Sequence, residues 1–140
     1  MTEVHFYSGV ANRLVMAQRV AHKAWQQAKW VIVYAEDTAL LDELDHDWWQ
    51  SPVTSFMPHA RAGMGHAHAT PIVLANTTEG LPHHDVLINL SAKTPGVFSR
   101  FDRLVEIVSV NQTDRQTARQ RWRFYQERGY ALHNHNMAET

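Results

Sequence analysis

Apolar and polar residues alternate along the chain in a pattern that predicts strands and helices in turn. Residues 3–7 alternate and include aromatic side chains, which is typical of a strand. Small and apolar residues then recur at helical spacing from Leu14 to Ala28. Residues 30–35 form a continuous apolar run, as in a strand buried on both faces. A strand, a helix and a second strand in such close succession predict a βαβ unit with the two strands paired in parallel.

The rest of the chain continues this alternation. Residues 37–46 predict a short acidic helix with Asp37 at its N-terminus, where a negative charge is favourable. Residues 71–75, 85–90 and 103–110 predict three more buried strands. The pattern therefore predicts an α/β fold in one domain, residues 1–140, with an open, mostly parallel sheet flanked by helices.

Turn and cap signals mark the boundaries of these elements. Ser8 is the candidate N-cap of the first long helix. Thr113 and Gln116 form a capping-box pattern that opens a last helix, and Gly129 is placed to end it. The glycines and histidines of residues 59–70 predict a loop. A short helix is expected within residues 91–102 and a last strand near residues 130–133.

Charge is almost balanced overall but uneven along the chain. The net charge is −1, which argues against a protein that coats nucleic acid, because such binding needs many phosphate contacts. Residues 30–60 contain no Lys or Arg and many acids, whereas residues 113–128 are rich in Arg. This asymmetry predicts two faces with different partners.

Composition also limits the cellular compartments and the kinds of chemical site that we expect for this chain. The chain has no cysteine, which excludes disulfides, Cys-zinc sites and a thiol nucleophile. Its first residues lack the apolar run of a signal peptide, and no apolar stretch approaches the roughly 18 residues of a membrane span. We therefore expect a cytoplasmic protein.

No pattern for cofactor chemistry is evident. The turn after the first strand holds Gly9 alone, and neither a dinucleotide-binding glycine motif nor a P-loop occurs. The chain has 10 histidines, with pairs at His66 and His68, His83 and His84, and His133 and His135. Because these pairs are scattered and no metalloprotease motif is present, we predict surface histidines, no metal site and no cofactor. Serines and paired acids offer no triad motif and no glycosidase pattern, so we also predict no catalytic residues.

Two features stand above this background. The first is an aromatic group around the adjacent Trp48 and Trp49, which cannot both face one core in a regular backbone, so one is predicted at the surface as an interface anchor. The second is the stripe Arg115, Arg119 and Arg123, at helical spacing beside Trp122. Like charges on one helix face repel, so the stripe predicts an acidic ligand, although a solvated face explains it equally well.

Several segments carry a resemblance through their order along the chain: FYS (6–8), KWVIVYAED (29–37), LDELDHDWW (41–49), SFMPH (55–59), AGMG (62–65), PIVLA (71–75), DVLINL (85–90) and ARQRWRFYQERGY (118–130). Together they resemble the chi subunit family of bacterial DNA polymerase III. The resemblance covers nearly the whole chain through the order and spacing of these pieces. It implies a nucleotide-binding-like sheet without a phosphate loop and a non-catalytic adaptor of the polymerase III clamp-loader assembly in DNA replication.

The resemblance also implies two partners. One is the psi subunit, at a surface to which Trp49, Phe56 and Pro58 correspond. The other is the acidic C-terminal tail of single-stranded DNA-binding protein (SSB), which ends in an apolar residue with a free carboxylate. The implied tail-binding residues are Val108, Arg115, Arg119, Trp122 and Arg123. Contact with nucleic acid would be indirect, and no membrane partner is implied.

Two alternatives remain open at the level of sequence. A small nucleotide- or metal-dependent enzyme on a Rossmann-like sheet is one, and the missing phosphate loop argues against it. A direct single-strand binder that stacks bases on Trp and Arg is the other, and the acidic N-terminal half argues against it.

Overall fold

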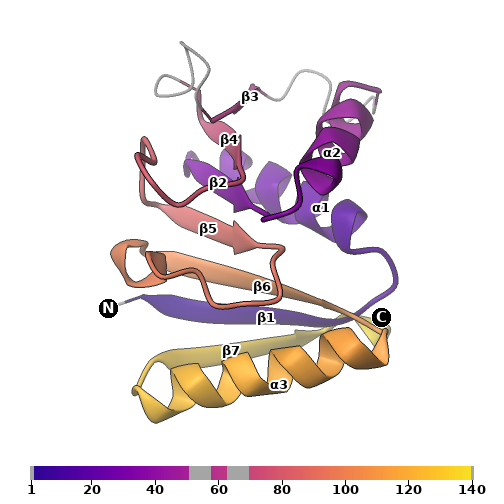
Figure 1. Ribbon diagram of the computed structural model, residues 1–140, viewed down its shortest axis with the longest axis vertical. Helices are drawn as coiled ribbons and strands as arrows, with labels where there is room; N and C mark the ends of the chain where they lie inside the picture. Colours follow the sequence, from indigo (N-terminus) through magenta and orange to yellow (C-terminus); the bar gives the residue numbers. More distant parts are fainter. Residues whose placement is uncertain (1, 51–57, 63–69, 140) are drawn as a thin grey trace.

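The computed structural model describes residues 2–50, 58–62 and 70–139, and the statements below concern those ranges. They form one α/β domain around a seven-stranded sheet in the order β3-β4-β2-β5-β6-β1-β7. The pairing is parallel at every strand contact. Figure 1 shows this open sheet with α1 and α2 toward its β3 end and α3 beside β7.

The helices and strands follow one another in near alternation. In chain order they are β1 (Glu3–Val10), α1 (Arg13–Gln26), β2 (Val31–Tyr34), α2 (Thr38–Gln50), β3 (His59–Arg61), β4 (Ile72–Ala75), β5 (Val86–Asn89), the 3-10 helix η2 (Phe98–Arg100), β6 (Arg103–Ser109), α3 (Gln112–Glu127), β7 (Ala131–Asn136) and the 3-10 helix η3 (Met137–Glu139).

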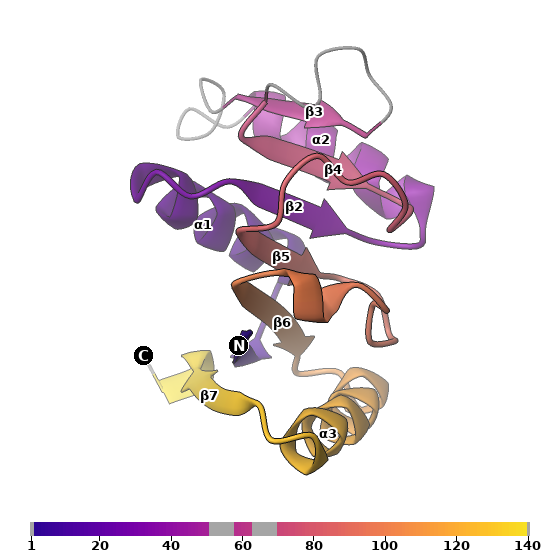
Figure 2. The same ribbon diagram turned by 90° about the vertical axis from the view of Figure 1, so that its left-hand side faces the viewer.

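Two apolar cores lie on opposite faces of the sheet. On one face, α1 and α2 pack with residues such as Ala21 and Leu44 against β2, β4 and β5. On the other face, α3 and η2 pack with Ala118, Tyr125 and Phe98 against β1 and β6. The turned view in Figure 2 separates α3 from α1 and α2. Because both faces are covered, the central strands are mostly apolar, as the sequence pattern predicted, with Asn89 and Glu106 as buried polar exceptions.

The predicted sheet is confirmed, and its neighbour order differs from the expected βαβ pair. Strand β1 pairs with β6 and β7, whereas β2 pairs with β4 and β5. The prediction of direct pairing between the first two strands was wrong, because β5 and β6 lie between them. Periodicity identifies a strand, but long-range packing decides its neighbours.

Three local predictions are corrected by the structure. Ser8 lies within β1, and Asn12 caps α1 by accepting hydrogen bonds from the backbone N–H groups of Leu14 (3.0 Å) and Val15 (3.2 Å). Asn111, not Thr113, caps α3. The predicted loop at residues 59–70 contains the short edge strand β3, which is too brief to show an alternating pattern. No helix in the described ranges is long and apolar enough to cross a membrane.

Candidate functional site

A pocket of about 390 Å³ opens beside α3, and we call it the α3 pocket. It lies where α3 and strands β1, β6 and β7 meet. Its lining residues are Phe6, Ser8, Val108, Arg115, Ala118, Arg119, Trp122 and Asn134. The floor is apolar, because Phe6, Val108 and Ala118 are all buried. This shape and lining suit a small apolar side chain.

The rim of the α3 pocket is basic and aromatic. Arg115 and Arg119 are both exposed and stand one helical turn apart. Trp122 is half-buried and meets the ring of Phe6 edge-on, with centroids 5.1 Å apart. A guanidinium beside an apolar pocket can bind a carboxylate through two parallel hydrogen bonds. The pocket can therefore accept an apolar group and an anion together.

Most of the predicted tail-binding residues come together in this pocket. Val108, Arg115, Arg119 and Trp122 all line it, whereas Arg123 is exposed on α3 and is not part of the lining. Four further lining residues were not predicted for this site: Phe6, Ser8, Ala118 and Asn134. Phe6, Ser8 and Asn134 come from β1 and β7, and no spacing in the sequence links them to α3.

A buried polar network joins the sheet-facing side of α3 to strands β5 and β6. The Tyr125 hydroxyl donates to Glu106 Oε2 (2.6 Å), and Asn89 Nδ2 donates to Glu106 Oε1 (3.0 Å). Arg121 Nε lies 3.2 Å from Glu106 Oε1, and its Nη1 donates to the backbone carbonyl of Ala92 (2.8 Å). Although Arg121 belongs to the Arg-rich stretch, it is a buried structural residue. This network fixes the rotation of α3 and so the direction of the pocket side chains.

Protonation in this network follows from burial. Loss of water raises the pKa of the Glu106 carboxyl, and the neighbouring Arg121, Tyr125 and Asn89 oppose that rise. Burial also raises the pKa of Tyr125, with the Glu106 carboxyl adding to the effect. The Tyr125 hydroxyl therefore remains a hydrogen-bond donor at neutral pH.

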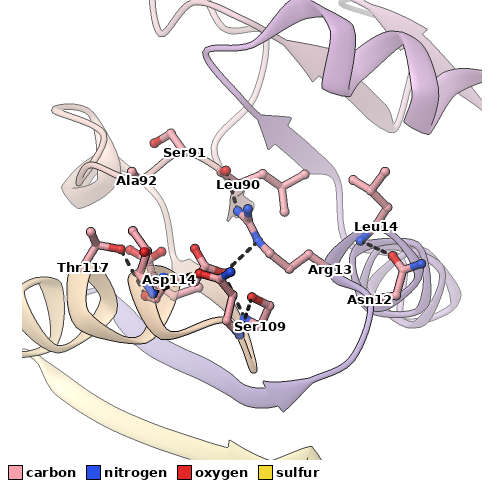
Figure 3. A network of polar contacts seen from close by, with 12 residues as sticks. Asn12, Arg13, Leu14, Leu90, Ser91, Ala92, Ser109, Asp114 and Thr117 are labelled. Carbon is pink, nitrogen blue, oxygen red and sulfur yellow. Dashed lines mark hydrogen bonds and ion pairs between the residues drawn. The ribbon is translucent and has the colours of Figure 1, made fainter.

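Related sheets bind nucleotides at the carboxyl ends of their strands. At the ends of β5 and β6 this region holds hydrogen-bonded side chains from α1 and α3. Arg13 is the first residue of α1, and its side chain reaches toward α3. Its Nε lies 3.6 Å from Asp114 Oδ2, and its Nη2 donates to the backbone carbonyl of Leu90. Asp114 also accepts a hydrogen bond from the backbone of Ser109 (3.0 Å). Figure 3 shows these contacts joining the starts of the two helices.

Gly9, predicted in a turn after the first strand, lies within β1 where the pairing with β6 becomes irregular. It has a φ of +66°, and a Cβ atom there would lie 2.9 Å from the side chains of Ala138 and Asn136. The close approach is therefore made by the C-terminal segment of the chain. This glycine needs no phosphate to explain it.

The second predicted surface is only partly described. Trp48 is fully buried against the ring of His59, whereas Trp49 is 58% exposed at the end of α2. The expectation that one of the two tryptophans lies at the surface is thus confirmed. Pro58 is also exposed, and Phe56 lies outside the described residues.

Comparison with known proteins identifies the family. The family model described as "DNA polymerase III chi subunit, HolC" matches residues 1–133. The chain belongs to the DNA polymerase III chi subunit family. It is 38% identical to DNA polymerase III subunit chi of Pseudomonas aeruginosa over 98% of each chain. It is 29% identical to the chi subunit of Escherichia coli, over 81% of this chain and 78% of the relative.

Family membership settles the general role of the chain. The chi subunit is a non-catalytic accessory subunit of DNA polymerase III, and it serves DNA replication. The predicted membership of the chi subunit family is therefore confirmed. The individual partners are a separate question.

Proposed function

We propose that this chain is the cytoplasmic adaptor that links the polymerase III clamp loader, through psi, to the acidic C-terminal tail of SSB. The observation that supports this best is the α3 pocket, with its buried apolar floor and the exposed Arg115 and Arg119 at its rim. An acidic peptide that ends in an apolar residue carries both groups that such a pocket binds.

The proposed binding mode follows from the geometry of the pocket. The last apolar side chain of the tail would rest on Phe6 and Val108, beside the ring of Trp122. Its terminal carboxylate would accept hydrogen bonds from the guanidinium of Arg119. Arg115 and the exposed Arg123 would attract the preceding acidic residues, an interaction that salt weakens.

A peptide titration tests this proposal. We expect saturable binding of a fluorescent SSB-tail peptide that weakens as salt is raised and disappears when the last residue of the peptide is removed. The affinity should be in the micromolar range, because so short a tail buries little surface. Equal binding of the intact and the truncated peptide would reject the pocket as the site.

Replacement of Arg119 tests the role assigned to the rim. Arg119→Ala should weaken binding of the tail peptide by about 1–3 kcal/mol, or about 5- to 150-fold in affinity, because a charge-assisted hydrogen bond is lost. The matched control is Arg19→Ala, which removes the same charge from an exposed position on α1. If both variants lost the same affinity, the effect would be one of general charge and not of the pocket.

The psi contact is proposed for the surface around Trp49. A largely exposed Trp is a favoured anchor in protein interfaces, because it buries a large area at low entropic cost. Trp49→Ala should weaken capture of psi by about 2 kcal/mol or more, measured by co-purification and by titration. Val15→Ala removes another exposed apolar side chain, on α1, and should leave psi binding unchanged.

Phe56→Ala provides a second test of the psi surface. This replacement should disrupt co-purification with psi and leave tail binding intact. A collapsed thermal transition would instead assign Phe56 to the core. Normal psi binding by both the Phe56 and the Trp49 variant would remove this surface from the proposal.

The competing enzyme and single-strand-binder hypotheses have their own readouts. A nucleotide that bound the native protein would raise its melting temperature. An oligonucleotide bound directly would show a steep salt dependence without any tail peptide. We expect neither effect.

A further inference from the structure

Three histidines and a glutamate gather on the face of β1 and β7 opposite the α3 pocket. The strands pair in parallel, with His5 opposite His133 and Tyr7 opposite His135. Alternate residues of a strand point to the same face, so Glu3, His5 and Tyr7 share one side with His133 and His135. These residues lie at the two ends of the chain, which is why the sequence pattern left the histidines scattered.

The ligand atoms of three of these residues converge. Glu3, His5 and His133 each offer one atom within 4.8 Å of the other two. Glu3 Oε1 lies 3.6 Å from His5 Nε2 and 3.7 Å from His133 Nε2. Ligand atoms about 2.0–2.1 Å from a tetrahedral metal ion lie roughly 3.3–3.4 Å apart. The two Glu3 contacts are within a few tenths of an ångström of that spacing, and the pair of histidine nitrogens, within 4.8 Å, would close by a turn of the half-exposed His133 ring.

The polar groups of His5 are arranged as a metal ligand requires. Its Nε2 atom is buried, and the nearest polar partner given for it is Glu3 Oε1 at 3.6 Å. Its other nitrogen, Nδ1, lies 3.0 Å from His135 Nε2. When Nδ1–H donates to His135, Nε2 keeps its lone pair and has Glu3 Oε1 as its near neighbour. The His133 ring stacks on His5, so it must turn before its own nitrogen can meet the same ion. Metal-bound histidines usually donate their second ring nitrogen to such a partner.

Ring stacking holds the cluster in place. His5 stacks on His133 with centroids 4.5 Å apart, and Tyr7 stacks on His135 at 4.6 Å. Glu3 and His133 are about half exposed, whereas His5 is largely buried. An ion could therefore enter from solvent and meet one fixed ligand and two adjustable ones. Arg103, paired in register with Glu3, is a nearby cation that opposes a metal ion, and Lys23 and Lys29 line the same pocket as Glu3. The Glu3 carboxylate partly offsets these charges.

We propose that Glu3, His5 and His133 form a binding site for one zinc-class divalent transition-metal ion. Two imidazole nitrogens and one carboxylate are a ligand set that suits Zn²⁺, with a water molecule in the fourth position. Mg²⁺ and Ca²⁺ prefer oxygen ligands alone and should not compete. The bound ion joins β1 to the edge strand β7, whose opposite face supplies Asn134 to the α3 pocket.

Calorimetric titration of the full-length protein with ZnCl₂ tests the site. We expect one ion bound per chain and a melting temperature that rises with Zn²⁺ but not with Mg²⁺. His133→Ala and Glu3→Gln should each lower the affinity at least tenfold. His135→Ala should lower it about 10- to 100-fold, because His5 loses its hydrogen-bond partner.

Control variants separate this site from the other histidines. His46→Ala, at an exposed position on α2, should bind Zn²⁺ as the parent does, and so should the His66→Ala/His68→Ala double variant. The melting temperature of metal-free His133→Ala should match that of the parent, because this side chain is about half exposed. Parent-like zinc affinity in His133→Ala, or zinc binding lost in the His66/His68 variant, would overturn the proposal. No binding at 100 µM ZnCl₂ would do the same.

Discussion

At the scale of single residues, the arginines of α3 differ in burial according to the partner that each one meets. Arg121 is buried and meets the fully buried carboxylate of Glu106, whereas Arg115 and Arg119 remain exposed at the pocket. Removing one partner of a buried ion pair is costly, because the other charge remains without compensation. Glu106 is thus satisfied by three side chains, from Asn89, Arg121 and Tyr125.

Tyr125→Phe tests the strength of this network. The replacement keeps the ring and removes the hydroxyl that donates to Glu106 at 2.6 Å. We expect the free energy of unfolding to fall by about 1.5–3 kcal/mol, as for a hydrogen bond to a charged group. Urea unfolding followed by circular dichroism measures it. An unchanged midpoint would show that Arg121 and Asn89 satisfy the carboxylate without Tyr125.

At the scale of elements, α3 carries both the buried network and the pocket. Its buried side includes Ala118, Arg121 and Tyr125, at helical spacing. The stripe of Arg115 and Arg119 therefore faces out along the pocket. The start of this helix is set by Asn111, whose side chain accepts from the backbone N–H groups of Thr113 (2.9 Å) and Asp114 (3.2 Å).

A pair of cap variants distinguishes the predicted cap from the observed one. Asn111→Ala should lower the free energy of unfolding by about 1 kcal/mol, because two N–H groups lose their acceptor. Thr113→Ala should change it by less than about 0.5 kcal/mol, because the side chain of Thr113 does not cap α3. Thermal or urea unfolding of both variants provides the comparison. A larger loss in the Thr113 variant would restore the capping box that the sequence predicted.

At the scale of the whole molecule, the two proposed partner surfaces lie far apart on one sheet. Trp49 is on α2, toward the β3 end, and the α3 pocket lies at the β7 end (Figures 1 and 2). The strands between them are buried and regularly paired. Such a scaffold can hold two partners at once without bringing them into contact.

This separation predicts independent binding. A saturating concentration of tail peptide should change the affinity for psi by less than about twofold, since distant sites without shared contacts add within about 0.3–0.5 kcal/mol. Titration of psi with and without the peptide measures the coupling. A larger change would mean that the sheet transmits a conformational difference between its ends.

The sequence by itself determined the class of the fold and half of the residues that line the α3 pocket. Continuous apolar runs identified the strands, and helical spacing placed Arg115 and Arg119 on one face with Trp122 beside them. The resemblance added the family, and the comparisons confirmed it. These features are local along the chain, or depend on the order of segments, so they can be read without coordinates.

Only the tertiary structure decided the features that join distant parts of the chain. It paired β1 with β7, which brought His5 beside His133 and added Phe6 and Asn134 to the pocket. It also buried Trp48 while leaving Trp49 exposed, and it buried Arg121 against Glu106. The physical reason is the same in each case. Side-chain periodicity fixes which residues share a face, but the packing of whole elements fixes which faces meet.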